Sequence, residues 1–272
     1  MKNYISKLIK FKSFNSKLGL NFKDYYHMSK YSSDTYLKGN VNLFNKNILF
    51  SNPFWLLHSL EEIFVDEVYL FEKSDNEVLI LDCGANIGLS MIYLKKLFKN
   101  AKFIAFEPDK KIFQQLETNI KTFEINQDVE LINAAVWINA DDLTFFSEGS
   151  LGGKIINQDD HHPNNTVVKA VRLKDYIINK PVFFLKIDIE GAEYTVLKDI
   201  KDDLKNVENL FIEFHNTIDE KDTLSEILLW VSEAGFKYYI KEAWDNMPHP
   251  FTQVNIGGGF HMQLNIFCFR EK

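Results

Sequence analysis

The chain has 272 residues, of which 46% are hydrophobic, and a formal net charge of −7. This composition is typical of a globular protein with a large core, and the negative charge argues against a nucleic-acid partner, which needs a basic face. With no apolar run of about 20 residues and no secretory signal pattern, we expect no transmembrane segment and a cytoplasmic location. Cys83 and Cys268 form neither a zinc pattern nor a disulfide framework, so we expect both in the core.

Residues 1–47 differ in character from the rest of the chain. They are rich in Lys, Asn, Ser and Tyr, and they predict one or two short helices followed by a hairpin over residues 41–50. We expect an N-terminal appendage over residues 1–47 and a main domain over residues 48–272. The appendage either covers the substrate site or a partner subunit of a homo-oligomer, or it is only a solvated helical cap.

The main domain begins with an apolar strand that ends in an acid and a glycine-bracketed turn. Residues 78–81 are apolar, Asp82 follows, and Gly84 and Gly88 bracket a turn before the helical pattern of residues 89–97. This pattern predicts a buried parallel strand, a tight turn and a helix, the first unit of a doubly wound α/β sheet. In such a fold a small ligand binds at the carboxyl ends of the strands, where this turn lies.

A second strand, residues 102–106, ends in Glu107 and Pro108 about 20 residues beyond the glycines. An acid at this spacing is where a doubly wound fold holds the hydroxyls of a ribose. The proline ends the strand and helps to direct the carboxylate into the crevice. The ligand is therefore expected to contain a nucleoside.

Further strands follow at residues 129–132, 182–187, 210–214 and 265–269. Between the first two of these, residues 143–146 and 167–171 predict an inserted antiparallel β-hairpin. The polar segment that joins the two halves of this hairpin contains His161 and His162, and we expect a loop near the site, in which either histidine could close over a substrate.

The glycine spacing distinguishes between nucleoside ligands. A nicotinamide or flavin fingerprint reads G-x-G-x-x-G, and its middle glycine lets the backbone approach a pyrophosphate. Here Asn86 occupies that position, and Asp82 is expected to point into the site. An acid suits a positively charged ligand, so these residues favour S-adenosylmethionine, which carries a sulfonium and an amino group, over NAD.

Two sequence blocks resemble the FkbM family of S-adenosylmethionine-dependent methyltransferases. Residues 82–88 (DCGANIG) are similar to its D-x-G-A-N-x-G signature, and residues 185–193 (LKIDIEGAE) resemble its K-I-D-x-E-G-A-E block. Residues 62–64 with Tyr69, and residues 133–136, resemble flanking parts of the family. The resemblance implies a Rossmann-like class I methyltransferase sheet over roughly residues 48–270.

The fold and the resemblance together imply which residues bind the cofactor. They are Asp82, Gly84, Ala85, Asn86, Gly88, Glu107, Pro108, Ala135 and Asp188.

Methyl transfer to a hydroxyl also needs a base, because an unassisted hydroxyl is a poor nucleophile. His215, which ends a strand beside an acid, is the preferred base, and Asp188 and Glu190 are the other candidate catalytic residues. For Glu193 the alternative is that it only caps the following helix. Asp188, Glu213 and His215 could instead bind a divalent ion such as Mg²⁺ or Mn²⁺. Linear spacing does not require an ion, so no metal ligand is assigned.

The expected function is therefore transfer of a methyl group to a hydroxyl. By the resemblance, the acceptor is a sugar, a glycan or a nucleotide-linked sugar of bacterial surface polysaccharide biosynthesis, or else a polyketide or another small molecule. Two other classes are alternatives: an NAD-dependent oxidoreductase, which Asn86 disfavours, and a non-catalytic nucleoside-binding module. Retention of both blocks together with Glu107 argues against the latter.

Overall fold

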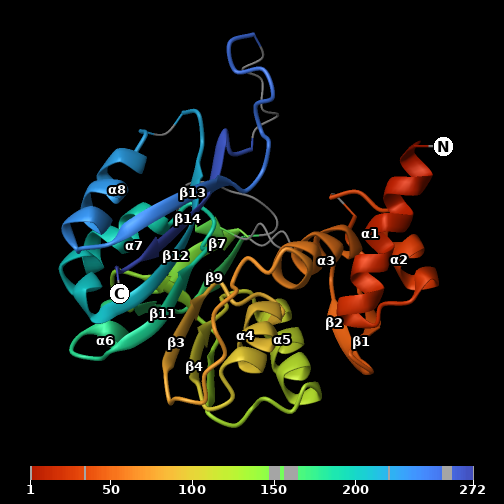
Figure 1. Cartoon of the computed structure of the whole chain (residues 1–272). Helices are drawn as coiled ribbons and strands as arrows, with labels where there is room; N and C mark the ends of the chain where they lie inside the picture. The colour runs from red at the N-terminus through yellow and green to blue at the C-terminus, as the bar shows by residue number, and fades with distance from the viewer. Residues whose placement is uncertain are drawn as a thin grey trace.

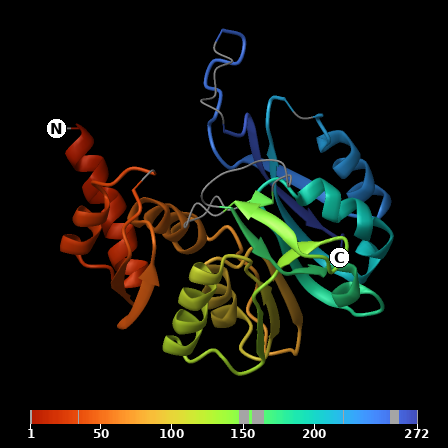
Figure 2. The ribbon, with the colours of Figure 1, turned by 180° about the vertical axis from the view of Figure 1, so that it is seen from behind.

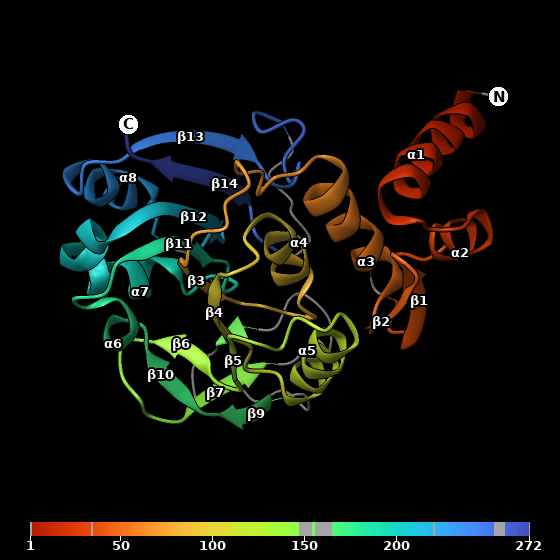
Figure 3. The same cartoon turned by 60° about the horizontal axis from the view of Figure 1, so that its bottom comes forward.

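The computed structural model describes residues 2–33, 35–146, 154–155, 165–219, 221–252 and 259–271. Its centre is a seven-stranded sheet, whose strands are seen in succession in Figure 3. In spatial order the strands are β13 (Lys237–Glu242), β14 (Met262–Phe269), β12 (Val207–Asn216), β11 (Val182–Ile187), β3 (Leu79–Cys83), β4 (Lys102–Phe106) and β5 (Val129–Ile132). All neighbours are parallel except β14, which is antiparallel to both β12 and β13.

Helices cover both faces of this sheet. Figure 3 shows α4 (Leu89–Leu97) and α5 (Lys110–Thr122) on one face. The other face carries α6 (Lys174–Ile177), α7 (Glu193–Ile200) with the short 3-10 helix Lys201–Asn206, and α8 (Leu224–Glu233). Successive side chains of a strand point to opposite faces, so Ile80 belongs to the core under α4 and α5, whereas Leu81 belongs to the core under α6 to α8.

The strand order reverses at β3. The chain proceeds from β3 outward to β4 and β5, and then returns to the other side of β3 to form β11 and β12. This reversal creates a crevice at the carboxyl ends of β3 and β11, which is where ligands bind in open α/β sheets. The predicted doubly wound, Rossmann-like fold is confirmed, and the predicted strands at residues 102–106, 129–132 and 182–187 have the observed bounds.

The N-terminal region contains α1 (Lys2–Leu18), α2 (Phe22–Met28), β1 (Gly39–Leu43) and β2 (Lys46–Phe50). It lies at one side of the molecule (Figure 1), and the predicted hairpin is confirmed by the antiparallel pairing of β1 and β2. Phe14 and Leu18 of α1 belong to the same hydrophobic core as residues of α4 and α5. Strand β2 crosses residue 47, and the division of the chain at that residue remains a prediction.

A helix with two parts leads from the N-terminal region to the sheet. Asn52 caps α3 (Pro53–Leu60) by accepting hydrogen bonds from the N–H groups of Phe54 and Trp55, which stabilises a helix by about 1 kcal/mol. The helix continues as a π-helix, Glu61–Val65, with the Asp66 N–H donating to the Glu61 carbonyl. Single π-helical turns of this kind are frequent at functional sites, since they displace side chains from their α-helical positions.

The insertion after β5 contains β6 (Ala135–Trp137), β7 (Leu143–Phe146), β8 (Lys154–Ile155), β9 (Asn165–Val168) and β10 (Ala170–Arg172). The predicted hairpin is confirmed in the antiparallel pairing of β7 with β9, but residues 170 and 171 belong to β10, which pairs parallel with β6. In the view from behind, the strands of the insertion lie in front of the sheet (Figure 2). His161 and His162 fall outside the described residues.

In the described part of the chain, no helix is both long enough and apolar enough to cross a membrane.

Candidate active site

The turn after β3 brings two loops into direct contact. Gly84 has a φ of +84°, and a Cβ atom added to it would lie 1.8 Å from the Asp188 carbonyl oxygen. Its N–H and that of Ala85 both donate to the Phe106 carbonyl, at 3.1 and 2.9 Å. Any side chain at position 84 would therefore push apart the ends of β3 and β11.

Gly88 has a different role, although it also has a positive φ of +90°. A Cβ atom at this position would lie 2.8 Å from Leu116 and 3.1 Å from Ile120, both on α5. Gly88 therefore allows α4 to begin close to α5, and it lies outside the walls of the two hollows described below.

Glu107 is held in place by backbone groups. One carboxylate oxygen accepts from the Asn86 N–H at 3.0 Å and the other from the Asp109 N–H at 2.9 Å. Asn133 donates to the Glu107 and Pro108 carbonyls, which fixes the backbone at the end of β4. Burial raises the pKa of Glu107 to about 8, and the backbone hydrogen bonds oppose that rise.

Lys186 joins the two strands that border the reversal. It is opposite Asp82 in the parallel pairing of β11 with β3, and its Nζ lies 3.3 Å from Asp82 Oδ1 and 3.0 Å from Asp188 Oδ2. It also donates to the Gly84 carbonyl at 3.0 Å. Burial alone would lower the pKa of Lys186, but Asp188 and Asp82 outweigh burial and raise the pKa well above its ordinary value. Its ammonium group is therefore charged and unsuited to act as a base.

Two hollows meet beside the turns that follow β3 and β11. The larger, of about 350 Å³, extends from the turn after β3 toward α3, the π-helix and the segment between β13 and β14. The smaller, of about 60 Å³, is lined by Glu107, Pro108 and Ala135 together with the apolar side chains of Phe145 and Ile155. Both share Gly84, Asn86, Asp188 and Glu190 in their walls, so one elongated ligand can extend from one hollow into the other.

The chain matches a family model over residues 82–238, described as the methyltransferase FkbM domain, which is more than half of its length. The chain belongs to the FkbM methyltransferase family. Methyltransferase 1 of Beauveria bassiana is 24% identical over 200 residues, covering 65% of this chain and 79% of that protein. Methyltransferase sdnD of Sordaria araneosa is 27% identical, covering 53% of this chain and 68% of that protein. Among solved structures, the AdoMet complex of M. jannaschii TYW2 is similar with a TM-score of 0.49 and 17% identity over 89% of each chain.

The side chains that line the smaller hollow suit the nucleoside part of S-adenosylmethionine. A carboxylate that is already oriented by two N–H groups has remaining acceptor positions for ribose hydroxyls, since an ionised carboxylate offers about four. The apolar walls formed by Phe145 and Ile155 suit the flat face of an adenine. At the junction of the two hollows, Asp188 and Glu190 supply negative charge where the sulfonium and amino group would lie.

The structure places Asp82 elsewhere than the sequence predicts. Its side chain is 1% exposed and lies behind the walls of both hollows, where it accepts a hydrogen bond from Ser90 and pairs with Lys186. The negative charge of Asp82 is thus compensated within the protein, which corrects the expectation that it points toward a cationic ligand. Its position supports a structural role in holding Lys186.

His215 is also displaced from its predicted position on the wall of the site. It is 3% exposed, and three carboxylates surround it: Nδ1 lies 3.2 Å from Glu193, and Nε2 lies 3.4 Å from Glu213 and 3.7 Å from Glu190. Burial alone would lower the pKa of His215, but the acids outweigh burial and raise the pKa well above the usual value. An imidazole that is charged at neutral pH and faces acids is a poor general base, so the structure argues against the predicted role.

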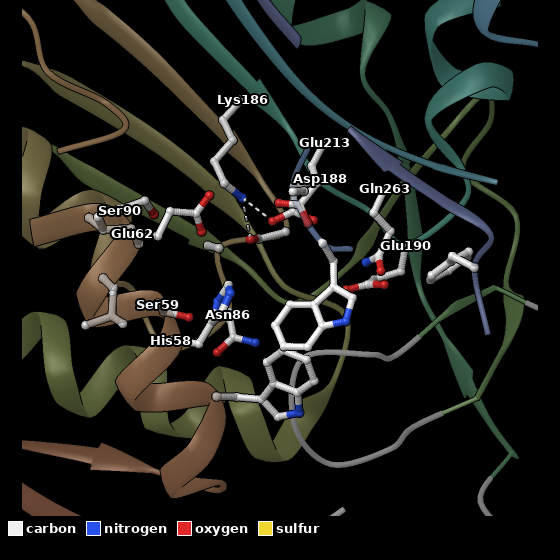
Figure 4. A pocket seen from close by; sticks show the side chains of 18 of the residues that line it. His58, Ser59, Glu62, Asn86, Ser90, Lys186, Asp188, Glu190, Glu213 and Gln263 are labelled. Atoms are coloured by element: carbon white, nitrogen blue, oxygen red, sulfur yellow. Dashed lines mark hydrogen bonds and ion pairs between the residues drawn. The ribbon is translucent and has the colours of Figure 1, made fainter. Parts of the chain in front are cut away.

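The two other predicted catalytic residues do lie in the wall of the larger hollow. Asp188 and Glu190 follow β11, and Figure 4 shows their carboxylates near that of Glu213. Burial raises the pKa of Glu190 to about 8, and the neighbouring His215 opposes this. Glu193, by contrast, is fully buried and accepts hydrogen bonds from the N–H groups of Ile189 and Gly191 ahead of its own helix.

Sequence reasoning did not identify Glu62 as a candidate catalytic residue. It lies in the π-helix and lines the larger hollow (Figure 4). Its Oε1 atom accepts a hydrogen bond from Asn265 at 2.9 Å. Burial raises the pKa of Glu62 to about 7, with Glu213 adding to the rise. The only signal in the sequence is its place in a block that resembles the family, because nothing local shows that it faces β11.

An aromatic cluster forms the outer wall of the larger hollow. Trp55 and His58 of α3 pack against Trp244, which follows β13, with ring centroids 5.6 and 5.2 Å from that of Trp244. Burial lowers the pKa of His58, which is therefore neutral at neutral pH. These rings come from segments that are far apart in the sequence, so their convergence could not be predicted from spacing.

Proposed function

We propose that this methyltransferase methylates a hydroxyl group of a saccharide: a sugar, a glycan or a nucleotide-linked sugar used in bacterial surface polysaccharide biosynthesis. S-adenosylmethionine supplies a methyl group that its sulfonium already activates. The contribution of the protein is to hold the acceptor hydroxyl in line, exclude water and accept a proton. The predicted cytoplasmic location and a homo-oligomeric state remain predictions.

The observation that carries this proposal is the composition of the larger hollow. Its outer wall presents the rings of Trp55, His58 and Trp244, whereas its inner wall presents carboxylates and amides. The carboxylates and amides that line this hollow are those of Glu62, Asn86, Asp188, Glu190, Glu213, Asn246 and Gln263. A sugar ring has C–H groups on its faces, which pack on aromatic rings, and hydroxyls around its edge, which bond to carboxylates and amides.

Glu62 is the base that the geometry favours. It faces the larger hollow, and a pKa of about 7 makes it half ionised near neutral pH, where a general base is most effective. In this arrangement one Glu62 oxygen takes the hydroxyl proton of the acceptor, while Asn265 donates to the Oε1 oxygen and keeps the carboxylate oriented.

A direct test is to incubate the purified chain with S-adenosylmethionine carrying an isotopically labelled methyl group and separate acceptor pools. The pools are nucleotide sugars, simple glycosides, oligosaccharides, and phenols or polyketides, and label transfer is followed by mass spectrometry. We expect label in a saccharide pool. Label only in the phenol or polyketide pool would transfer the proposal to that class, and tight S-adenosylhomocysteine binding with no transfer to any hydroxyl would reject it.

Trp244→Ala tests the aromatic wall. We expect KM for the saccharide to rise about fivefold or more, since stacking on one ring contributes on the order of 1 kcal/mol, while S-adenosylhomocysteine affinity stays unchanged. Phe251→Ala is the matched control, because Phe251 is fully exposed and outside the hollow. An equal effect of both substitutions would contradict acceptor binding by the wall.

A further inference from the structure

Three side chains at the ends of neighbouring strands have their potential ligand atoms close together. Asp188, Glu213 and His215 each offer one ligand atom, and these atoms all lie within 4.8 Å of one another. Asp188 follows β11, whereas Glu213 and His215 are two residues apart on β12 and therefore point to the same face of the sheet. The fold thus brings two carboxylates and one imidazole together beside the larger hollow, which Asp188 and Glu213 line.

The orientation of His215 points independently to a bound cation. Its Nδ1 lies 3.2 Å from Glu193 Oε1, and Glu193 is fully buried and held by two backbone N–H groups. Since a carboxylate accepts from Nδ1–H, the Nε2 atom is directed at Glu213 and Glu190. This atom is buried, and although it lies 3.4 Å from Glu213 and 3.7 Å from Glu190, it makes no hydrogen bond of good geometry within the described part of the chain. Histidine ligands of metals are typically oriented in this way, by a carboxylate that binds the other ring nitrogen.

The charges around the three side chains also favour an added cation. Five carboxylates, those of Glu62, Asp188, Glu190, Glu193 and Glu213, gather at this end of β11 and β12. Lys186 offsets part of this charge, but it also compensates Asp82 and contacts Oδ2 of Asp188. When these groups are ionised, their negative charge exceeds the positive charge of Lys186 and His215, and a bound cation would favour the ionised forms.

We propose that Asp188, Glu213 and His215 bind a divalent cation of the Mg²⁺ or Mn²⁺ kind at the edge of the larger hollow. Two carboxylate oxygens and one imidazole nitrogen suit such ions, and the open side toward the hollow leaves room for further oxygen ligands. If the proposed hydroxyl methylation is right, an acceptor hydroxyl could be one of these ligands. The ion would then lower the pKa of the hydroxyl beside Glu62.

The proposal is tested by metal binding, which is read out separately from methyl transfer. The full chain is treated with EDTA, dialysed and titrated with Mn²⁺, and free Mn²⁺ is followed by electron paramagnetic resonance. We expect one Mn²⁺ per chain and competition by Mg²⁺. Glu213→Gln and His215→Gln should each weaken Mn²⁺ binding by about tenfold or more.

Two matched controls distinguish Mn²⁺ binding at the site from nonspecific Mn²⁺ binding to other acidic groups of the protein. Glu242→Gln and His249→Gln change exposed side chains outside the site, so we expect Mn²⁺ binding to stay unchanged. Retained S-adenosylhomocysteine affinity and a normal circular dichroism spectrum show that each variant is folded. His215→Asn is the second variant at that position if His215→Gln does not fold.

Two outcomes would overturn the metal site: no stoichiometric Mn²⁺ binding to the wild-type chain, or equal Mn²⁺ affinity in the site variants and controls. His215 would then be a protonated partner of the surrounding acids. Failure of the metal-site proposal can be distinguished from failure of the proposed function. Label transfer to a saccharide by a chain that binds no Mn²⁺ would reject only the metal, whereas Mn²⁺ binding without transfer to any saccharide would reject only the acceptor.

Discussion

Lys186 shows that the role of a buried charge near the site depends on the charged groups that the fold places beside it. Asp82 is a negative residue at the end of β3, and considered alone it suits a positively charged ligand. In the structure Asp82 forms an ion pair with its cross-strand neighbour Lys186. The same ammonium group also pairs with Asp188 and donates a hydrogen bond to the Gly84 carbonyl. Removing one partner of such a group leaves an uncompensated buried charge, which is strongly destabilising. The geometry of the turn and the orientation of Asp188 therefore depend on the same lysine.

Glu62→Gln tests the proposed base. We expect kcat to fall by about 10²–10⁴-fold with S-adenosylhomocysteine affinity unchanged, because the amide cannot accept the hydroxyl proton. In the wild-type enzyme the rate should rise with pH through about 7, since Glu62 must be ionised to act, and Glu62→Gln should lose this rise. Both are measured in a pH–rate profile.

Glu61→Gln is the control for this variant, because Glu61 is the adjacent residue of the same π-helix but pairs with Lys10 outside the hollow. His58 is the competing candidate, since it also lines the larger hollow and is neutral at neutral pH. Near-normal kcat in Glu62→Gln with a large loss in His58→Gln would assign the base to His58.

Glu107→Gln tests the nucleoside subsite. A carboxylate that bonds to ribose hydroxyls contributes about 1.5–3 kcal/mol per bond, so we expect S-adenosylhomocysteine affinity to fall about tenfold or more by calorimetry. Because burial raises the pKa of Glu107 to about 8, wild-type affinity should increase as pH rises toward 8, and the variant should lack this increase. Glu117→Gln on the exposed side of α5 is the control, and equal affinities would remove Glu107 from the subsite.

Among the secondary-structure elements, the sheet was the most predictable part of the molecule. An apolar run in a strand buried on both faces is a local signal, and β4, β5 and β11 were predicted with their observed bounds. The strand ends also placed Glu107, Asp188 and Glu190 correctly at the crevice. Asp82 and His215 also end strands, but both side chains are buried outside the two hollows. Their burial depends on side chains from neighbouring strands and loops, which the local sequence does not show.

The elements that complete the larger hollow could not be predicted, for a physical reason. Glu62 faces it because a π-helical turn packs against β14, where Asn265 binds it, and Trp244 reaches Trp55 only once β13 and α3 are both docked. Such contacts join residues that are far apart in the sequence, and neither periodicity nor spacing encodes them.

Asn119→Ala tests how the N-terminal hairpin is attached to α5. Asn119 is fully buried, accepts from the Leu49 N–H, and donates to the Leu49 and Ile87 carbonyls. Alanine would leave these backbone groups without partners, at a cost of about 1–3 kcal/mol each. We expect the free energy of unfolding to fall by about 2 kcal/mol or more, measured by urea denaturation.

The control is Gln114→Ala, which removes an exposed side chain of the same helix and should leave stability nearly unchanged. If the hairpin is attached by Asn119, limited proteolysis of Asn119→Ala should also cleave the chain faster between residues 39 and 50. Unchanged stability and cleavage would show that the shared hydrophobic core is sufficient to hold the hairpin.

For the whole molecule, the site is built between the helix that precedes β3 and the edge of the sheet where β11 and β12 end. Residues of α3 and the π-helix form one side of the larger hollow, and the ends of β11 and β12 with the residues around β14 form the other. A substrate in this hollow would therefore contact the beginning, middle and end of the main domain at once. Many buried acids gather at this junction, so the stability of the whole chain should depend on pH.

The free protein should lose stability as pH rises from about 5 to about 8. Glu62 and Glu107 have ordinary pKa values near 4.5, which apply in the unfolded chain, but burial raises the pKa of Glu62 to about 7 and that of Glu107 to about 8. Between these limits the folded state holds protons that the unfolded state has released, so raising the pH favours unfolding. His215, whose pKa is raised above 6.5 by its acidic neighbours, acts in the same direction above that pH.

This dependence can be measured as the free energy of unfolding in urea at constant ionic strength across that pH range. Glu62→Gln should show a smaller slope than the wild-type chain, whereas the control Glu61→Gln should keep the full slope. Saturating S-adenosylhomocysteine should also reduce the slope, because ribose hydroxyls favour the ionised form of Glu107 and so lower its pKa in the complex. A wild-type chain that becomes more stable toward pH 8 would show that the buried acids are ionised in the free protein, as they would be with a cation bound between Asp188, Glu213 and His215.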